Sequence, residues 1–248
     1  MSGGNIENTS TGKFNLFQWF LDCLFPKECL ICKHEGEYFC QSCQVKTLFT
    51  YPLICFGCSK INVSSGICQD CQPRYAFDGI IIAADYEDEV IGSLIRMYKY
   101  RFVKSLAYDL SNILNKKLEV FIQQSHLGYA IEHDFFSAVV LGVPLSQRRE
   151  RWREFNQAQL LAMQVAEYCN LKFRNDILQR EHRPAQAKLN SSERLHNLID
   201  SFQTTTTPPS LVILVDDVVT TGATLHEAAK ALKKAGALEV WGLVVAKG

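Results

Sequence analysis

The amino-acid sequence predicts an α/β fold, with a mostly parallel sheet covered by helices on both faces and a small cysteine-rich domain before it. Apolar runs alternate with segments of helical period after residue 76, and four CxxC pairs precede them. Since 47% of the 248 residues are hydrophobic, the chain can bury a sizeable core. We therefore expect a flexible N-terminal tail over residues 1–20, a cysteine-rich domain over 21–75 and an α/β domain over 76–248.

Four short apolar runs are predicted to be strands, because turn signals bound each of them. They are residues 79–87, 137–145, 211–217 and 239–248. Four other segments place apolar residues three and four apart, which indicates helices. They are residues 89–100, 105–123, 156–169 and 225–237. Strands that alternate with helices favour a parallel sheet. The stretch FQTTTTPPS (202–210) is predicted to be a flexible connection into the third strand.

The charge balance excludes a strong field over the whole molecule. The 26 basic and 26 acidic residues cancel, so any polyanion must be met by a local patch. We find no apolar run long enough for a transmembrane segment, and the N-terminus MSGGNIENTSTGK lacks the features of a secretory signal. The expected compartment is therefore the cytoplasm.

Eight of the ten cysteines lie in four CxxC pairs, at Cys29/Cys32, Cys40/Cys43, Cys55/Cys58 and Cys68/Cys71. The pairs repeat along the chain, which indicates a duplicated four-cysteine unit. Four thiolates from two such turns complete a closed tetrahedral site, so we expect two structural Zn²⁺ ions in a double zinc ribbon. Interleaved pairing, one degenerate site and a disulfide knot remain alternatives. Cys23 and Cys169 are interpreted as small buried hydrophobic residues.

The stretch VILVDDVVTTGAT (212–224) predicts an anion site. A strand that feeds a glycine-bearing turn and then a helix collects backbone N–H groups at one point, which favours a phosphate. Thr220, Thr221 and Thr224 add hydroxyl donors. The preceding acids, Asp216 and Asp217, would accept hydrogen bonds from sugar hydroxyls, which points to a sugar phosphate. The alternative is a pair of acids that serve only in a helix cap and a salt bridge.

The same stretch resembles the phosphoribosyl pyrophosphate (PRPP) motif of type I phosphoribosyltransferases. Residues 142–162 and 183–202 further resemble segments of the ComF family, which joins a zinc ribbon to such a domain. The resemblance implies a Rossmann-like phosphoribosyltransferase fold and PRPP bound with Mg²⁺. It assigns catalysis to Asp216 and Asp217, and PRPP binding to Asp216, Asp217, Val218, Thr220, Thr221, Gly222, Ala223 and Thr224.

The resemblance also implies a pyrophosphate loop after the second strand. It would contain Val143, Pro144 and Leu145 with Arg148 and Arg149, and Arg151 or Arg153 are alternative cationic partners. A mobile lid would span residues 180–202, with Arg183, Gln186, Arg194 and Asn197, and its alternative is a solvated surface segment. The family usually has glycine where this chain has Glu154, which puts turnover in question.

The cluster RRERWR (148–153) could hold phosphates and stack on a base, or simply begin a solvated helix, and Lys99 and Arg101 could extend it. The resemblance implies a competence protein that binds PRPP and handles single-stranded DNA during natural transformation, with other DNA-uptake proteins as partners. One alternative is an active phosphoribosyltransferase that carries out pentosyl transfer to a nitrogenous base or amine. Another is a regulator that senses PRPP.

Overall fold

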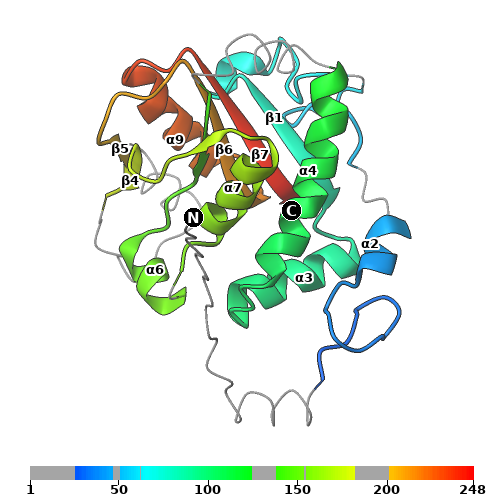
Figure 1. The fold of residues 1–248 in the computed structure, drawn as a ribbon. Coiled ribbons are helices and arrows are strands. Elements are labelled where there is room, and N and C mark those ends of the chain that lie inside the picture. The colour runs from blue at the N-terminus through cyan, green and yellow to red at the C-terminus, as the bar shows by residue number, and fades with distance from the viewer. Residues whose placement is uncertain (1–25, 47–50, 62, 125–137, 154, 182–200) are drawn as a thin grey trace, which may run out of the picture. The chain divides into compact units, whose positions relative to one another are not determined.

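A computed structural model of the chain describes residues 26–46, 51–61, 63–124, 138–153, 155–181 and 201–248 (Figure 1). The chain packs as two compact units, Met1–Thr47 and Leu48–Gly248. The eight paired cysteines therefore divide between the units, four in each. The domain boundaries expected from composition stay predictions, but the packing already separates the two halves of the expected ribbon.

The first unit is small. In its described part, Glu28 and Glu35 form an isolated antiparallel bridge and one short helix, α2 (Gln41–Lys46), follows. Among its described residues, 26–46, the buried side chains are Cys29, Phe39 and Cys43, and Phe39 is only 1% exposed. This stretch alone buries little apolar surface, so a bound metal ion would stabilise it.

The second unit is built on a five-stranded sheet whose strand pairs are all parallel. Its order is β1 (Gly79–Asp85), β7 (Glu239–Lys247), β6 (Leu211–Val219), β2 (Val139–Gly142) and β3 (Lys172–Phe173). The four longer strands confirm the four predicted ones, and β6 runs two residues past its predicted end. The two-residue β3 was not predicted, because it is too short to show any period.

The four predicted helices are present as α3 (Glu89–Tyr100), α4 (Leu106–Gln124), α7 (Gln157–Tyr168) and α9 (Ala223–Lys234), and the RRERWR cluster lies in a short helix, α6 (Gln147–Arg153). The starts of two helices are fixed by side chains that accept backbone N–H groups. Asp88 accepts from two such groups at 2.9 Å before α3, and Asn156 caps α7. In the described residues, no helix is long and apolar enough to cross a membrane.

The two faces of the sheet are covered differently. Helices α4 and α7 pack together on one face, and α9 covers part of the other (Figure 1). Beside α9, residues of the second cysteine segment join the same apolar core, namely Tyr51, Cys55, Phe56, Ile67, Cys68, Cys71 and Phe77. This segment therefore replaces a covering helix over β1. The predicted architecture, a parallel sheet with helices on both faces, is confirmed.

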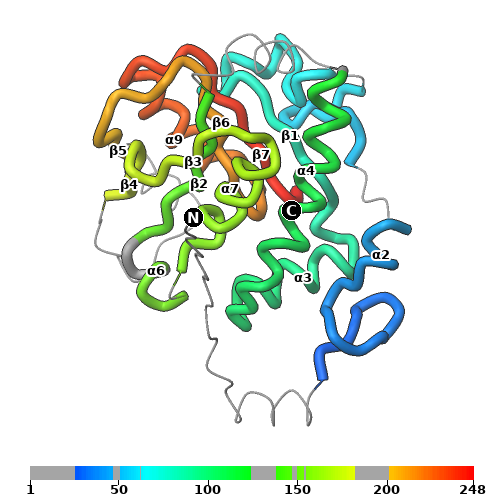
Figure 2. Tube along the Cα trace, viewed as in Figure 1, coloured from blue at the N-terminus to red at the C-terminus, as the bar shows by residue number. Residues whose placement is uncertain are grey.

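The cysteine segment of the second unit also covers the outer edge of the sheet, where β1 is the last strand. The backbone N–H of Ile80 donates to the carbonyl of Ser65 at 2.9 Å, and that of Phe56 donates to Gly66 at 2.7 Å. Gly66 has a φ of +71°, and a Cβ there would lie 2.0 Å from the carbonyl oxygen of Ile80. Figure 2 shows this segment, in cyan, leading into β1. A short 3-10 helix, η1 (Gln72–Arg74), lies just before the strand.

A separate antiparallel ribbon pairs β4 (Leu178–Arg180) with β5 (Phe202–Thr204). The prediction of a flexible connection over residues 202–210 was therefore wrong for its first three residues. Phe202 is only 5% exposed, so burial of its ring anchors the start of this stretch. Of the expected lid, 180–202, the structure describes the two ends, and Arg183, Gln186, Arg194 and Asn197 lie outside the described residues.

Candidate functional site

The carboxyl ends of β2 and β6 lie side by side, with Gly142 paired to Val215. The chain leaves β2 towards β3 on one side, and it leaves β6 through α9 towards β7 on the other. The crevice between two such strands is the usual ligand site of an open parallel sheet. The N–H of Val143 donates to the carbonyl of Val215 at 2.9 Å, which holds the following loop beside the acids of β6.

A pocket of about 140 Å³ opens at this point. It is lined by Lys99, Val143, Pro144, Leu145, Arg153, Gln157, Ala158, Arg180, Asp216, Asp217, Val218 and Thr224. The structure thus brings together the predicted loop, both predicted acids and part of the predicted phosphate motif. Thr220 and Thr221 are exposed on the adjoining turn and do not line the pocket.

The two acids differ in their surroundings. Asp217 is only 5% exposed, and its Oδ1 lies 2.8 Å from the Nζ of Lys99. Asp216 accepts a hydrogen bond from the backbone N–H of Asp217 at 2.8 Å. Burial, and then the charge of Asp217, raise the pKa of Asp216 to about 7 against the opposing effect of Lys99 and Arg180. The pair therefore holds one carboxylate beside an internal cation and one carboxyl that titrates near neutrality.

Two buried side chains that also line the pocket have donors without partners. Arg153 is 8% exposed and its Nη1 donates to the Oε1 of Gln157 at 3.0 Å, while Gln157 is 1% exposed. The Nε of Arg153 and the Nε2 of Gln157 have no hydrogen-bond partner among the described residues. Buried donors without partners are costly, so this wall fits an anionic ligand.

The positions of these groups are fixed by their neighbours. Asn156, which caps α7, also donates from its Nδ2 to the carbonyl of Val143 at 3.1 Å, so one side chain ties the helix start to the loop. The hydroxyl of Tyr98, fully buried on α3, donates to the carbonyl of Gln157 at 2.9 Å. Burial and the charge of Asp217 raise the pKa of Tyr98, so this hydroxyl stays a donor.

Four of these residues were not predicted as site residues. Tyr98 carries no local signal, and Lys99 was predicted only as part of a surface patch. Gln157 was noted only within the segment that resembles the ComF family, and Arg180 only as the first residue of the expected lid. Tyr98 follows the apolar period of its helix, Gln157 stands in the FNQ segment, and Arg180 lies in a three-residue strand. Their proximity to the acids arises only from the tertiary fold.

The predicted strand, turn and helix of the phosphate motif are present. Gly222 caps α9 with a φ of +77°, a left-handed conformation that favours glycine. A Cβ at this position would lie 2.8 Å from the Cε1 of Phe56, so the loop is also closely covered. The hydroxyl of Thr221 accepts from the N–H of Ala223 at 3.4 Å.

The described side chains of the RRERWR cluster differ in their exposure along α6. Arg151 is exposed, and Trp152 is 58% exposed with its ring 6.4 Å from that of Tyr100. Arg153 turns inwards, over the Tyr100 ring at 5.8 Å, and reaches the pocket. The side chains of Arg148 and Arg149, and all of Glu154, lie outside the described residues, so their assignments stay predictions.

The eight paired cysteines form two clusters that could each hold a metal ion. They are the first cluster, Cys29, Cys32, Cys40 and Cys43, and the second cluster, Cys55, Cys58, Cys68 and Cys71, and in each the sulfur atoms lie within 4.8 Å of one another. This grouping excludes interleaved pairing. The Sγ atoms of Cys32 and Cys40 are 3.6 Å apart, far beyond the roughly 2.05 Å of a disulfide.

The two clusters share an internal pattern. Burial acts to raise the thiol pKa of Cys29 and of Cys55, but backbone N–H groups bonded to their sulfurs outweigh it and lower each pKa to about 6. Burial, together with the neighbouring sulfurs, raises the pKa of Cys43 and of Cys71 to about 12. Outside the clusters, burial raises the pKa of the half-buried Cys169 to about 11, and Cys23 lies outside the described residues.

Comparison with known proteins agrees with this geometry. Residues 158–247 match the phosphoribosyl transferase domain. The chain is 29% identical over 213 residues to competence protein F of Haemophilus influenzae, covering 82% of this chain and 89% of that protein. Over most of its length the chain is therefore similar to proteins named for competence. Competence protein ComFC of Bacillus subtilis is 29% identical over 212 residues, covering 81% of this chain and 80% of its own. DNA utilization protein YhgH of Escherichia coli K12 is 29% identical over 228 residues, covering 87% and 96%.

Proposed function

We propose that the protein binds PRPP with Mg²⁺ at the crevice between β2 and β6, and that it uses this site in the uptake or utilisation of DNA. The observation that carries the first part is a single pocket shared by Asp216, Asp217 and Thr224, the 143–145 loop, and buried donors from Arg153 and Gln157. Carboxylates and unpartnered donors around one pocket suit a ligand that has both hydroxyls and phosphates.

Each part of the ligand has a proposed place. The 5′-phosphate rests on the 220–224 turn at the start of α9, where backbone N–H groups converge. The ribose hydroxyls donate to Asp216 and Asp217, which act by positioning the sugar. The pyrophosphate lies along the 143–145 loop, where Arg153 and Arg180 stabilise the charge that develops as it leaves.

The acids also fit Mg²⁺, which prefers oxygen ligands and is held in many proteins by one or two carboxylates together with phosphates. Mg²⁺ bound here would neutralise the pyrophosphate and favour its departure. Asp216 and Asp217 would hold it, and Lys99 would keep Asp217 compensated before it arrives. The eight clustered cysteines fit Zn²⁺ in two closed thiolate sites, because four sulfur ligands are typical of structural zinc.

The DNA role rests on the relatives and on one surface feature. The similar proteins are named for competence and for DNA utilization. Next to the pocket, Tyr100 and Trp152 are exposed and in contact, and the exposed Arg101 and Arg151 are close in sequence. Exposed aromatic rings beside cationic residues are typical of single-stranded nucleic-acid contact. We infer that DNA lies along this surface, with other DNA-uptake proteins as partners.

Calorimetry with PRPP and Mg²⁺ tests the ligand. The wild-type protein should bind, and the double variant Asp216→Asn with Asp217→Asn should lose binding. Asp85→Asn is the matched control, because this exposed acid also ends a parallel strand of the same sheet but lies outside the pocket. Unchanged affinity in the double variant, or equal loss in the control, would remove the site assignment.

A second measurement separates the proposed classes of activity. Pyrophosphate release in the presence of a panel of bases and amines identifies an active transferase, whereas PRPP binding without release identifies a binding or sensing protein. For DNA, Tyr100→Ala with Trp152→Ala should weaken single-strand binding by about 1–3 kcal/mol per stacked base. Binding that is unaffected by both changes would remove the surface assignment.

A further inference from the structure

The second cysteine cluster lies in the same core as the turn at residues 220–224, called the phosphate turn below. Cys55, Cys68 and Cys71 are buried, and the core that contains them also contains the first two turns of α9 through Leu225 and Ala228. The sulfurs fit a metal, since they lie within 4.8 Å of one another and the N–H of Cys68 already donates to the Sγ of Cys55 at 3.3 Å. Metal site and phosphate turn are thus parts of one packed structure.

One side chain connects the two directly. Phe56 follows the first cysteine of the cluster and is 6% exposed. Its Cε1 would lie 2.8 Å from a Cβ on Gly222, so the ring edge sits against the backbone of the turn. The ring also contacts those of Tyr75 and Phe77, with centroids 5.5 Å and 6.4 Å away. A shift of the CxxC turn therefore moves a wall of the phosphate turn.

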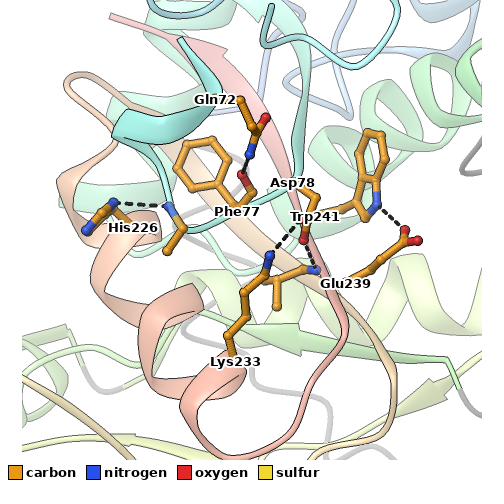
Figure 3. Close-up of polar contacts among 9 residues, drawn as sticks. Gln72, Phe77, Asp78, His226, Lys233, Glu239 and Trp241 are labelled. Atoms are coloured by element: carbon orange, nitrogen blue, oxygen red, sulfur yellow. Dashed lines mark hydrogen bonds and ion pairs between the residues drawn. The ribbon is translucent and has the colours of Figure 1, made fainter. Parts of the chain in front are cut away.

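The segment after the cluster is fixed to both ends of α9, as Figure 3 shows. The N–H of Ala76 donates to the Nδ1 of His226 in the first turn of the helix, at 3.2 Å. Asp78 accepts from Lys233, in its last turn, at 2.6 Å and from the N–H of Val240 at 2.8 Å. Within the segment itself, the Nε2 of Gln72 donates to the carbonyl of Phe77 at 2.9 Å.

We propose that the second cluster holds the phosphate turn in shape through Phe56, so that metal bound to Cys55, Cys58, Cys68 and Cys71 raises the affinity of the protein for phosphorylated ribose. Phe56 is then a positioning residue that touches the turn and not the ligand. The coupling is reciprocal, so ligand binding also strengthens metal binding at the second cluster. The predicted gain in affinity rests on the proposed PRPP site. The predicted effect of the metal on the shape of the turn does not depend on that site.

The test compares Cys58→Ser with Cys32→Ser, which change the same position of each repeat, and both residues are exposed. Each variant should lose one metal ion by elemental analysis. In Cys58→Ser, amide hydrogen exchange over residues 219–226 should become about tenfold faster and the affinity for PRPP with Mg²⁺ should fall about tenfold. Cys32→Ser should change neither, and β2 (139–142) serves as the internal reference. Loss of the second metal with unchanged exchange, or an equal effect of Cys32→Ser, overturns the proposal.

A second pair of variants covers the case in which Cys58→Ser does not fold. Phe56→Ala should retain both metals and still show faster exchange over residues 219–226, and Phe56→Leu should recover most of the protection because it refills the space. Slow exchange in Phe56→Ala overturns the proposal. If the wild-type protein does not bind PRPP, the proposed function fails, and the exchange measurement still decides whether the metal supports the turn.

Discussion

The two cysteine clusters have the same CxxC spacing and different surroundings. The first lies in residues 26–46, the described part of the first unit, where Phe39 is the one other buried side chain beside Cys29 and Cys43. The second is embedded in the core of the larger unit, against β1 and α9. In the first region a metal would hold together a described stretch with few buried side chains, and in the second it would shape a large apolar core. The same ligand set can therefore make folding itself, or only local geometry, depend on metal.

Removal of metal by a chelator should produce the largest difference in stability between the two regions. The first unit is expected to unfold when metal is removed, because metal binding supplies about 10–16 kcal/mol of folding free energy in small thiolate domains. The larger unit should keep its sheet, since five paired strands do not depend on thiolates. Hydrogen exchange with and without chelator measures both. Simultaneous loss of protection in α2 and in β6 would contradict this difference.

Two matched core substitutions should sharpen the comparison. Phe77 is fully buried in the larger unit, and changing it to alanine should lower the free energy of unfolding of that unit by about 3–5 kcal/mol. Phe39→Ala, at a side chain 1% exposed in the first unit, should leave the larger unit unchanged. Amide hydrogen exchange in β6 and β7, followed as denaturant is added, reports on the larger unit. Equal destabilisation by both variants would show that the units do not fold separately.

Ligand binding at the pocket of the larger unit should depend on pH, and changes in the first region should not alter this dependence. Because the pKa of Asp216 is raised to about 7, its carboxyl is mostly protonated at pH 6 and mostly ionised at pH 8. Only the ionised form accepts hydrogen bonds from two ribose hydroxyls or holds Mg²⁺, so affinity for PRPP with Mg²⁺ should rise about tenfold between these values. Asp216→Asn should flatten this rise, and Cys32→Ser in the first region should preserve it. A wild-type affinity that is constant across this range would contradict the raised pKa.

The smallest expected effect concerns the ion pair that links the segment after the second cluster to helix α9. The ion pair of Lys233 with Asp78 is about one-third exposed, so Lys233→Met should cost less than about 1 kcal/mol of the free energy of unfolding. Lys234→Met, at the exposed neighbouring position, is the control. Thermal unfolding measures both. A larger loss at Lys234 than at Lys233 would show that this ion pair does not anchor the segment.

The sequence predicted what local signals encode. Strands β1, β2, β6 and β7 and their helices follow from apolar period, and the acids and the glycine turn follow from one continuous stretch. Lys99 could not be assigned to the pocket, nor Tyr98 to its contact with Gln157, because only the packing of α3 brings them there. Arg180 was expected only as the first residue of the lid, and the β4–β5 ribbon places it in the pocket. Cysteine spacing indicated the two clusters, but it contains nothing about what covers them, so the place of the second cluster in the core was not foreseen.

The hydrogen bond between Ser65 and Ile80 covers an edge strand that could otherwise cause aggregation. The strand it covers, GIIIAAD, has no charge in its first six residues and lies at the open side of the sheet. Uncovered strands of this kind pair with other chains and seed aggregates. If bound metal keeps the covering turn in place, production of the protein in zinc-poor medium should give insoluble material, and supplying the ion during synthesis should restore the yield.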